Sequence, residues 1–261
     1  MTIWQTTALG ALAGFTIYLG LPVARLRPRT RTIQNLLNAL ALGVLLFLVW
    51  DILSKALEPV GEALKAAMKS GHWNLFGSLV LMLIFGLVLG LVGLVAFHDT
   101  ALRRSSPGTR IAHHLTLLVA TGLGLHNFSE GLAIGQAAST GAIGFAVILI
   151  IGFGLHNITE GFAVATPLAA AGEVPSWSFL GMAGLIGGGP TFLGTLIGYH
   201  VTFPQAFVLF LALAAGALFY VIGEMFAVGR RFQRPLGSAW GIVLGFLVAY
   251  GTDLILTIGG A

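Results

Sequence analysis

The chain has 261 residues, of which 57% are hydrophobic and only 8% are charged. Because a soluble globular domain carries about 25% charged residues, this composition excludes a water-soluble protein and indicates an integral membrane protein with one transmembrane domain, 1–261. The net charge of +4 is compatible with nucleic-acid binding, but the placement of the arginines indicates another role. The chain contains no cysteine, which excludes disulfides and thiolate metal ligands.

Eight segments are apolar over the roughly 20 residues that a helix needs to cross a bilayer. They are 3–24, 33–56, 75–97, 112–136, 141–166, 178–200, 205–228 and 237–258. The sequence therefore predicts an all-α integral membrane protein with eight transmembrane helices. The first segment lacks a basic region and a small-residue cleavage site, so we expect it to be a retained helix.

Arginines cluster in three of the short connections between these segments. They are Arg25, Arg27, Arg29 and Arg31 in the first, Arg103, Arg104 and Arg110 in the second, and Arg230, Arg231 and Arg234 in the third. With eight spans, all three connections lie on one side, which the positive-inside rule makes cytoplasmic. We therefore expect a multi-pass protein of the plasma (inner) membrane with both termini on the extracytoplasmic side, lipid as its surroundings, and no nucleic-acid partner.

Lysines stand on the opposite side. Lys55, Lys65 and Lys69 all fall at or beyond the end of the predicted helix 33–56. We expect the following stretch, 57–72, to be an external loop or a short amphipathic helix, whose charges form a solvated face.

Two near-copies of one motif stand in the predicted helices 112–136 and 141–166. Residues 122–134 read GLGLHNFSEGLAI, and residues 152–164 read GFGLHNITEGFAV. Each copy carries one His, one Asn and one Glu: His126, Asn127 and Glu130, then His156, Asn157 and Glu160. An ionisable group in a membrane segment is costly unless a partner or a water-lined path offsets its dehydration. The two copies therefore indicate one site built from two helices.

The spacing within each copy suits a metal ion. His126 and Glu130 are four residues apart and share one helix face, as do His156 and Glu160. If the two faces meet, two imidazoles and two carboxylates form a cage of the kind that Zn²⁺ accepts tetrahedrally, although ligand type alone leaves Ni²⁺, Co²⁺ and Fe²⁺ open. A purely structural role in helix–helix hydrogen bonding is disfavoured, because the predicted helix cores contain no Lys or Arg that could pair with the glutamates.

The doubled motif resembles that of the ZIP (Zrt/Irt-like) family of divalent metal transporters, which carries HNxPEG on its fourth helix and H/Q-N/D-x-P-E-G on its fifth. The resemblance covers essentially the whole chain. It implies uptake of Zn²⁺ toward the cytoplasm, with Fe²⁺, Mn²⁺, Cd²⁺ and Co²⁺ as further substrates. It also implies a 3+2+3 arrangement, in which helices 1–3 and 6–8 are inverted repeats around helices 4 and 5, an elevator-like movement of a four-helix unit, and a homodimer.

The resemblance assigns roles to individual residues. His126, Glu130, His156 and Glu160 match the family's primary metal site, and Asn127 and Asn157 match positions that contribute to a second, adjacent metal. Asp51 and Glu224 match polar residues on the transport pathway. From the sequence alone, Asp51 could equally be a helix-end residue solvated at the external interface, and the 98–114 loop, with His98, Asp99, His113 and His114, could receive the released ion or be merely interfacial.

The chain departs from the family pattern at three points. Ser129 and Thr159 replace the proline that precedes each glutamate, and Gly189 stands before Pro190 where the family usually has a glutamate. Asn157 occupies a position that is Asp in some relatives. Because the second metal position then offers two neutral amides and only shared carboxylates, we predict one strong metal site and a second that is weak or unfilled.

Two alternatives to a transporter remain open at this stage. A passive metal channel would show flux that does not saturate, whereas a four-ligand site that dehydrates its ion predicts saturable transport. An intramembrane metal-dependent hydrolase would need an open metal position and a general base. The sequence contains no HExxH helix and no evident Ser or Cys nucleophile system, so we do not expect an enzyme.

Overall fold

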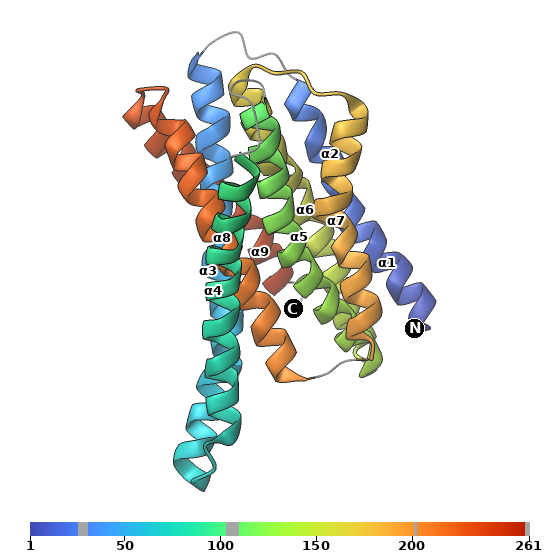
Figure 1. The fold of residues 1–261 in the computed structure, drawn as a ribbon. Coiled ribbons are helices and arrows are strands. Elements are labelled where there is room, and N and C mark those ends of the chain that lie inside the picture. The colour runs from blue at the N-terminus through green and yellow to red at the C-terminus, as the bar shows by residue number, and fades with distance from the viewer. Residues whose placement is uncertain (26–30, 103–109, 201–202, 259–261) are drawn as a thin grey trace.

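The computed structural model describes residues 1–25, 31–102, 110–200 and 203–258, and within these ranges the chain is helical with no strand. The helices are α1 (Ile3–Phe15), α2 (Ile17–Gly20), the 3₁₀ helix η1 (Leu21–Arg25), α3 (Arg31–Ser70), α4 (Asn74–Leu102), α5 (Arg110–Ser139), α6 (Ile143–Ala171), α7 (Trp177–Gly198), α8 (Pro204–Arg230) and α9 (Pro235–Ile258). Each predicted apolar segment corresponds to one of them, with α1, α2 and η1 together forming the first. Figure 1 shows them as one bundle.

Seven of the described helical runs are long and apolar enough to cross a membrane: Ile3–Arg25, α3, α4, α6, α7, α8 and α9. The helix lengths and compositions are those of a membrane-embedded helical protein. α5 is as long as its neighbours, but it is not among the seven. Its three histidines, together with Asn127 and Glu130, lower its apolar character, and this is the helix at the centre of the candidate site.

The two ends of the bundle differ in the charges that they carry (Figure 1). The end of η1, the start of α3, the end of α8 and the start of α9 lie together and bring Arg25, Arg31, Arg230, Arg231 and Arg234 to what we call the arginine end. The opposite end carries the turn between α3 and α4, and we call it the hairpin end. Arg27, Arg29, Arg103 and Arg104 lie outside the described residues.

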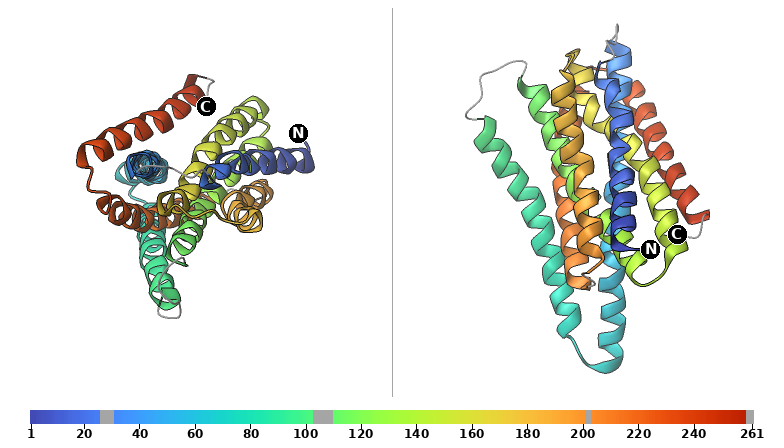
Figure 2. Two further views of the ribbon diagram at one scale, coloured as in Figure 1. Left: turned by 90° about the horizontal axis from the view of Figure 1, so that it is seen from above. Right: turned by 90° about the vertical axis from the view of Figure 1, so that its right-hand side faces the viewer.

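The second predicted helix is longer than the sequence indicated. The prediction ended it at residue 56 and placed an external loop or a separate short amphipathic helix at 57–72, but α3 continues without a break to Ser70, with Pro59 inside it. Val60 and Ala63 are buried against Leu79 of α4 and Val208 of α8, so tertiary packing maintains the helix past its proline. The α3–α4 hairpin therefore projects beyond the other helices (Figures 1 and 2), and Lys55 lies within a helix instead of at its end.

Glycines divide the helices into two units. At many of them an added Cβ would strike the backbone of a neighbouring helix, which is the close approach that small residues permit in lipid. In the motif unit (α1, α2, α5, α6 and α7) these glycines are Gly14, Gly20, Gly124, Gly131, Gly135, Gly161, Gly188, Gly194 and Gly198. In the hairpin unit (α3, α4, α8 and α9) they are Gly43, Gly86, Gly90, Gly216 and Gly245. Every one of these 14 described glycines contacts a helix of its own unit.

Contacts between the two units are of another kind. α5 faces α8, and α3 faces α6, through buried Leu, Val, Ile, Met and Ala side chains of a single core cluster. At Gly122 of α5, an added Cβ would lie 3.5 Å from side-chain atoms of Leu218 and Val221, which is ordinary van der Waals distance. Seen along the bundle axis, α3, α4, α8 and α9 lie on one side, and α1, α6 and α7 lie on the other (Figure 2).

Candidate metal centre

The two motif copies meet at the contact between α5 and α6. The ligand atoms of His126, Glu130 and His156 lie within 4.8 Å of one another. Nε2 of His126 is 3.2 Å from Oε1 of Glu130 and 3.6 Å from Oε1 of Glu160. Because ligand atoms around a tetrahedral Zn²⁺ with bonds of about 2.0–2.1 Å are roughly 3.3 Å apart, small side-chain rotations would bring this group to coordination distance.

These four side chains are buried, and several of their polar atoms lack hydrogen-bond partners. Their exposed fractions range from 0% for Glu160 to 6% for Glu130. Glu130 Oε2, His156 Nε2 and Glu160 Oε1 are fully enclosed and accept no hydrogen bond. Buried polar atoms are almost always paired, and the exceptions call for an explanation. A cation held among His126, Glu130 and His156 would satisfy the first two of these atoms. Glu160 Oε1 lies at the edge of this group, 3.6 Å from His126 Nε2, so the donor set fits a divalent metal.

The two copies occupy different surroundings although their sequences match. The α5 copy opens onto a cavity of about 400 Å³, whose walls include His126, Ser129 and Glu130. The cavity runs along α5 past Gln136 and Thr140 toward the hairpin end. The α6 copy does not line this cavity, and its Asn157 and Glu160 are 0% exposed. An ion from the hairpin end would therefore meet the α5 copy first.

The asparagines of the two copies form a network that joins three helices. Nδ2 of Asn127 donates to Oδ1 of Asn157 at 2.7 Å, to Oε2 of Glu160 at 2.8 Å and to the carbonyl of Gly187 on α7 at 3.0 Å. Asn157 donates to the carbonyl of Phe153 on its own helix. The amides thus hold the Glu160 carboxylate in place, and the Asn157 oxygen already accepts a hydrogen bond.

The hydroxyls that replace the family's prolines behave alike in both copies. Ser129 Oγ donates to the carbonyl of His126, and Thr159 Oγ1 donates to that of His156, both at 2.6 Å. α5 and α6 run through these positions as continuous helices. A backward hydroxyl–carbonyl bond of this type loosens the local helix, and here it involves the carbonyl of each histidine.

Asp51 forms an ion pair with Lys55, a residue that the sequence analysis placed at the end of the predicted helix 33–56. Asp51 is only 9% exposed and lies in the middle of α3, so it is not a residue solvated at a helix end. Lys55 Nζ is 2.7 Å from Asp51 Oδ2, and Lys55 lines the cavity together with His126 and Glu130. The expectation that no Lys or Arg in a helix core could pair with the glutamates overlooked Lys55, which lies within α3 and lines the cavity with Glu130, although its ion pair is with Asp51. The error followed from ending α3 at residue 56.

Glu224 lies toward the arginine end, away from the four-ligand group. It lines a second cavity, of about 390 Å³, with Arg31, Glu173 and Arg231. This cavity is bounded by the ends of α5, α6 and α8 that lie at the arginine end.

Histidines of the 98–114 segment also gather near this end, where residues 103–109 lie outside the described part. Tyr220 OH contacts Nδ1 of His98, and the rings of His98 and His114 meet edge to face at 5.1 Å. Nδ1 of His113 is 3.0 Å from Oε2 of Glu173. These contacts join α4 to α8 and α5 to the segment that follows α6, and no pattern in the sequence had indicated a role for Tyr220.

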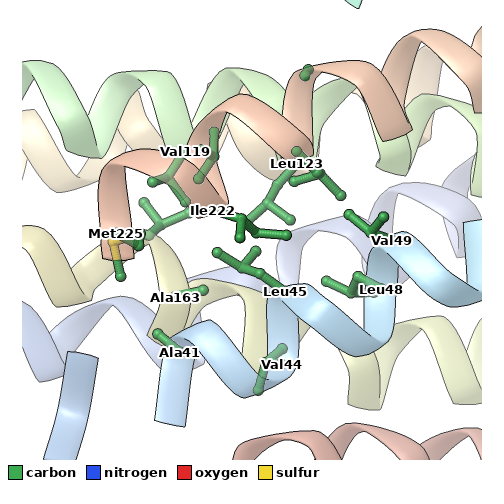
Figure 3. Close-up of a cluster of buried hydrophobic side chains, with 14 of the residues drawn as sticks. Ala41, Val44, Leu45, Leu48, Val49, Val119, Leu123, Ala163, Ile222 and Met225 are labelled. Carbon is green, nitrogen blue, oxygen red and sulfur yellow. The ribbon is translucent and has the colours of Figure 1, made fainter. Parts of the chain in front are cut away.

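Aliphatic side chains separate the two cavities. Leu45, Leu48, Leu123 and Ile222 belong to one buried cluster, and the last is the most exposed at 6%. Figure 3 shows side chains of α3, α5, α6 and α8 converging there. Leu123 is one helical turn from His126 on the side of the arginine end, so this aliphatic barrier closes the site toward that end. Of these two cavities, only the one that opens toward the hairpin end reaches the four-ligand group.

Gly189, the position where the family usually has a glutamate, does not face the site. An added Cβ there would meet only Leu185, which belongs to the same helix, α7. The α7 contribution to the centre is instead the carbonyl of Gly187, through Asn127.

Comparison with known proteins gives no further assignment. No family model matches the chain, and no curated protein matches it.

Proposed function

We propose that this protein is a ZIP-like transporter that moves divalent metal ions, Zn²⁺ first and Fe²⁺, Mn²⁺, Cd²⁺ or Co²⁺ as alternatives, through the His126–Glu130–His156–Glu160 group. One observation carries the proposal. Two buried imidazoles and the Glu130 carboxylate converge, with the Glu160 carboxylate 3.6 Å from His126 and with unpaired acceptor atoms, at the end of a cavity that a barrier closes on the far side. A binding site with access from one side only is what alternating access requires.

A transporter fits this geometry better than a channel or an enzyme. A channel needs a continuous path, but the aliphatic barrier interrupts the line between the two cavities. A metal-dependent hydrolase needs an open coordination position and a separate base, whereas here both glutamates are within 3.2–3.6 Å of His126 and act as ligands.

The division into two units supports an elevator-like movement. Glycine–backbone contacts fix the helices within each unit, whereas the interface between the units consists of side chains that can slide past one another. Most of these side chains are aliphatic, and the Phe128–Phe210 and His98–His114 ring contacts also cross the interface. The side-chain hydrogen bonds follow the same division: Thr16 bonds to Gly154 within the motif unit, and Asn38 bonds to Met225 within the hairpin unit. In this account the motif unit carries the ion across while the hairpin unit stays in place.

The pairing of helices agrees with the proposed 3+2+3 arrangement. A pseudo-two-fold axis that exchanges α3 with α8, and α4 with α9, converts the α4–α8 contact into the α9–α3 contact, and both are among the most extensive in the bundle. The same operation exchanges the α5–α7 contact with the contacts of α6 to α1 and α2. All eight helical runs, α5 included, then span the membrane with the arginine end in the cytoplasm.

The asparagine network supports one strong metal position. Asn157 Oδ1 already accepts from Asn127, and the Asn127 amide nitrogen also holds Glu160. A second ion beside the first would have to break these bonds without gaining a charged ligand from Gly189. The proposal therefore includes a single tightly bound dication, with its two charges balanced by two carboxylates.

The test is metal uptake by the purified protein in proteoliposomes, with Zn²⁺, Cd²⁺, Fe²⁺, Mn²⁺ and Co²⁺ in competition. We expect saturable Zn²⁺ uptake that Glu130→Gln abolishes. Glu62→Gln, on the projecting part of α3, serves as the control and should transport at the wild-type rate. Uptake that does not saturate would favour a channel, and unchanged uptake in Glu130→Gln would remove the proposed mechanism.

A further inference from the structure

A lysine in the cavity that leads to a cation site needs an explanation. Lys55 lines this cavity with His126 and Glu130, and its ammonium nitrogen is 2.7 Å from Asp51 Oδ2. The ammonium also interacts electrostatically with Glu130 and with Asp253 of α9. A fixed positive charge in this place opposes the approach of any metal ion.

The ion pair with Asp51 holds the ammonium at this point. Lys55 and Asp51 are four residues apart on α3, so they share one helix face. Asp51 is buried, whereas the Lys55 side chain keeps 42% of its surface exposed. The stem is therefore anchored on the hairpin unit, and the ammonium reaches into the cavity toward the α5 copy of the motif.

We propose that Lys55 is a tethered competitor cation that makes the site selective for ion valence. The ammonium supplies one positive charge to Asp51 and Glu130 before any ion arrives. Because it is attached to the chain, it competes at a high effective concentration. A monovalent ion offers no more charge than the ammonium already provides, whereas a dication offers twice the charge and can displace it.

This role deepens the proposed function and rests on it. It also explains why Asp51 does not act as a simple metal ligand at the mouth of the site: its carboxylate is already paired. An arriving dication would loosen the Lys55–Asp51 pair and pass to His126 and Glu130, with the lysine remaining on Asp51 afterwards. No proton or electron transfer is involved.

The experiment is a charge-exchange series at positions 51 and 55, measured as Zn²⁺ uptake in proteoliposomes. Lys55→Met should lower the half-saturating Zn²⁺ concentration about fivefold, which corresponds to roughly 1 kcal/mol for a partly solvated charge. Lys55→Arg keeps the charge and should stay near the wild-type value. Asp51→Asn leaves the ammonium unpaired near Glu130 and should raise the half-saturating concentration, and the double variant Asp51→Asn/Lys55→Met should return toward wild type.

A second measurement addresses valence directly. Choline chloride in the assay is replaced by sodium chloride at equal ionic strength, so that screening is unchanged. Sodium should leave the wild-type half-saturating concentration unaltered and should raise that of Lys55→Met severalfold. An unchanged or higher half-saturating concentration in Lys55→Met, or equal sodium effects in both proteins, would overturn the role of Lys55.

These outcomes differ from a failure of the proposed function. If the wild-type protein takes up no Zn²⁺, the transporter assignment itself fails. If the wild-type protein transports and Lys55→Met matches it, only the lysine's role is lost. Should Lys55→Met fold poorly, the opposite shifts expected for Asp51→Asn and the double variant still decide the matter.

Discussion

Helix contacts within the two units differ in chemistry from the contacts between them. Within a unit, glycines bring backbones together, as where Gly131 of α5 lies against the carbonyl of Thr191 on α7. Between units, aliphatic side chains such as Leu123 and Ile222 fill most of the space. A glycine–backbone contact has one register, because no side chain can adjust to a shift, whereas an aliphatic interface can exchange one set of contacts for another. Under the proposed elevator-like movement, this difference predicts which helices would move together.

Cross-linking each kind of interface in turn should give the largest effect and tests directly whether the two units move relative to each other. The chain has no cysteine of its own, so an introduced pair forms without background. Gly122→Cys/Val221→Cys joins the units, since an added Cβ at Gly122 lies 3.5 Å from Val221 Cγ2. Oxidation should abolish Zn²⁺ uptake, and reduction should restore it.

The matched control joins two helices of the motif unit. An added Cβ at Gly154 lies 3.7 Å from Thr16 Cγ2, so Gly154→Cys/Thr16→Cys has similar geometry. Its oxidised form should still take up Zn²⁺. Equal behaviour of the two cross-linked proteins, whether both active or both inactive, would contradict a relative movement of the units.

The second effect in size concerns a glycine contact itself. Gly131→Leu would drive a side chain into the backbone of α7, and we expect a loss of about 3 kcal/mol in the free energy of unfolding. Gly223→Leu adds the same side chain to α8 where nothing lies within 4 Å, and it should leave stability unchanged. Unfolding in mixed detergent measures both, and similar stabilities would show that the glycine contacts do not hold the unit together.

Truncation at the interface between units should cost somewhat less and should change transport. Leu123→Ala removes buried aliphatic volume from the barrier, and we expect a loss of about 2 kcal/mol in the free energy of unfolding. The thinner barrier should add a component of Zn²⁺ flux that does not saturate. Wild-type kinetics in this variant would mean that Leu123 is not part of the seal.

Replacing the amides inside the motif unit should have an effect of similar size at Asn127 and the smallest effect at Asn157. Asn127→Ala removes three hydrogen bonds that tie α5 to α6 and α7, and it should cost about 2 kcal/mol. Asn157→Ala removes one acceptor and a bond to its own helix, and about 1 kcal/mol should be lost. Thermal unfolding of the two variants side by side checks the order, which would be reversed if Asn157 were the main link.

The sequence predicted the helices and the metal-binding group from local patterns. Apolar length located all eight helical runs. The four-residue spacing of His and Glu placed each pair on one face, and the structure has His126 and Glu130 in contact. The end of α3 escaped prediction because Pro59 is an ordinary stop signal, and only contacts with Leu79 and Val208 keep the helix intact. Lys55 was misplaced for the same reason, although its spacing from Asp51 was visible in the sequence.

The difference between the two motif copies lay beyond sequence reasoning altogether. HNFSEG and HNITEG have the same pattern, so nothing local distinguishes the copy that lines the cavity from the copy that is enclosed. Their exposure depends on which helices cover them, and α5 and α6 have different neighbours on the hairpin side. The division into two units likewise required knowing which helix each glycine meets.

The central claim is that both copies close around one dication, and anomalous diffraction at the zinc edge from Zn²⁺-loaded crystals tests it most directly. The account predicts one strong peak between α5 and α6, within bonding distance of His126, His156, Glu130 and Glu160, and a weak peak or none beside Asn127 and Asn157. Two peaks of equal height there would contradict the single-ion account, and a peak elsewhere with none among these four side chains would contradict the site itself.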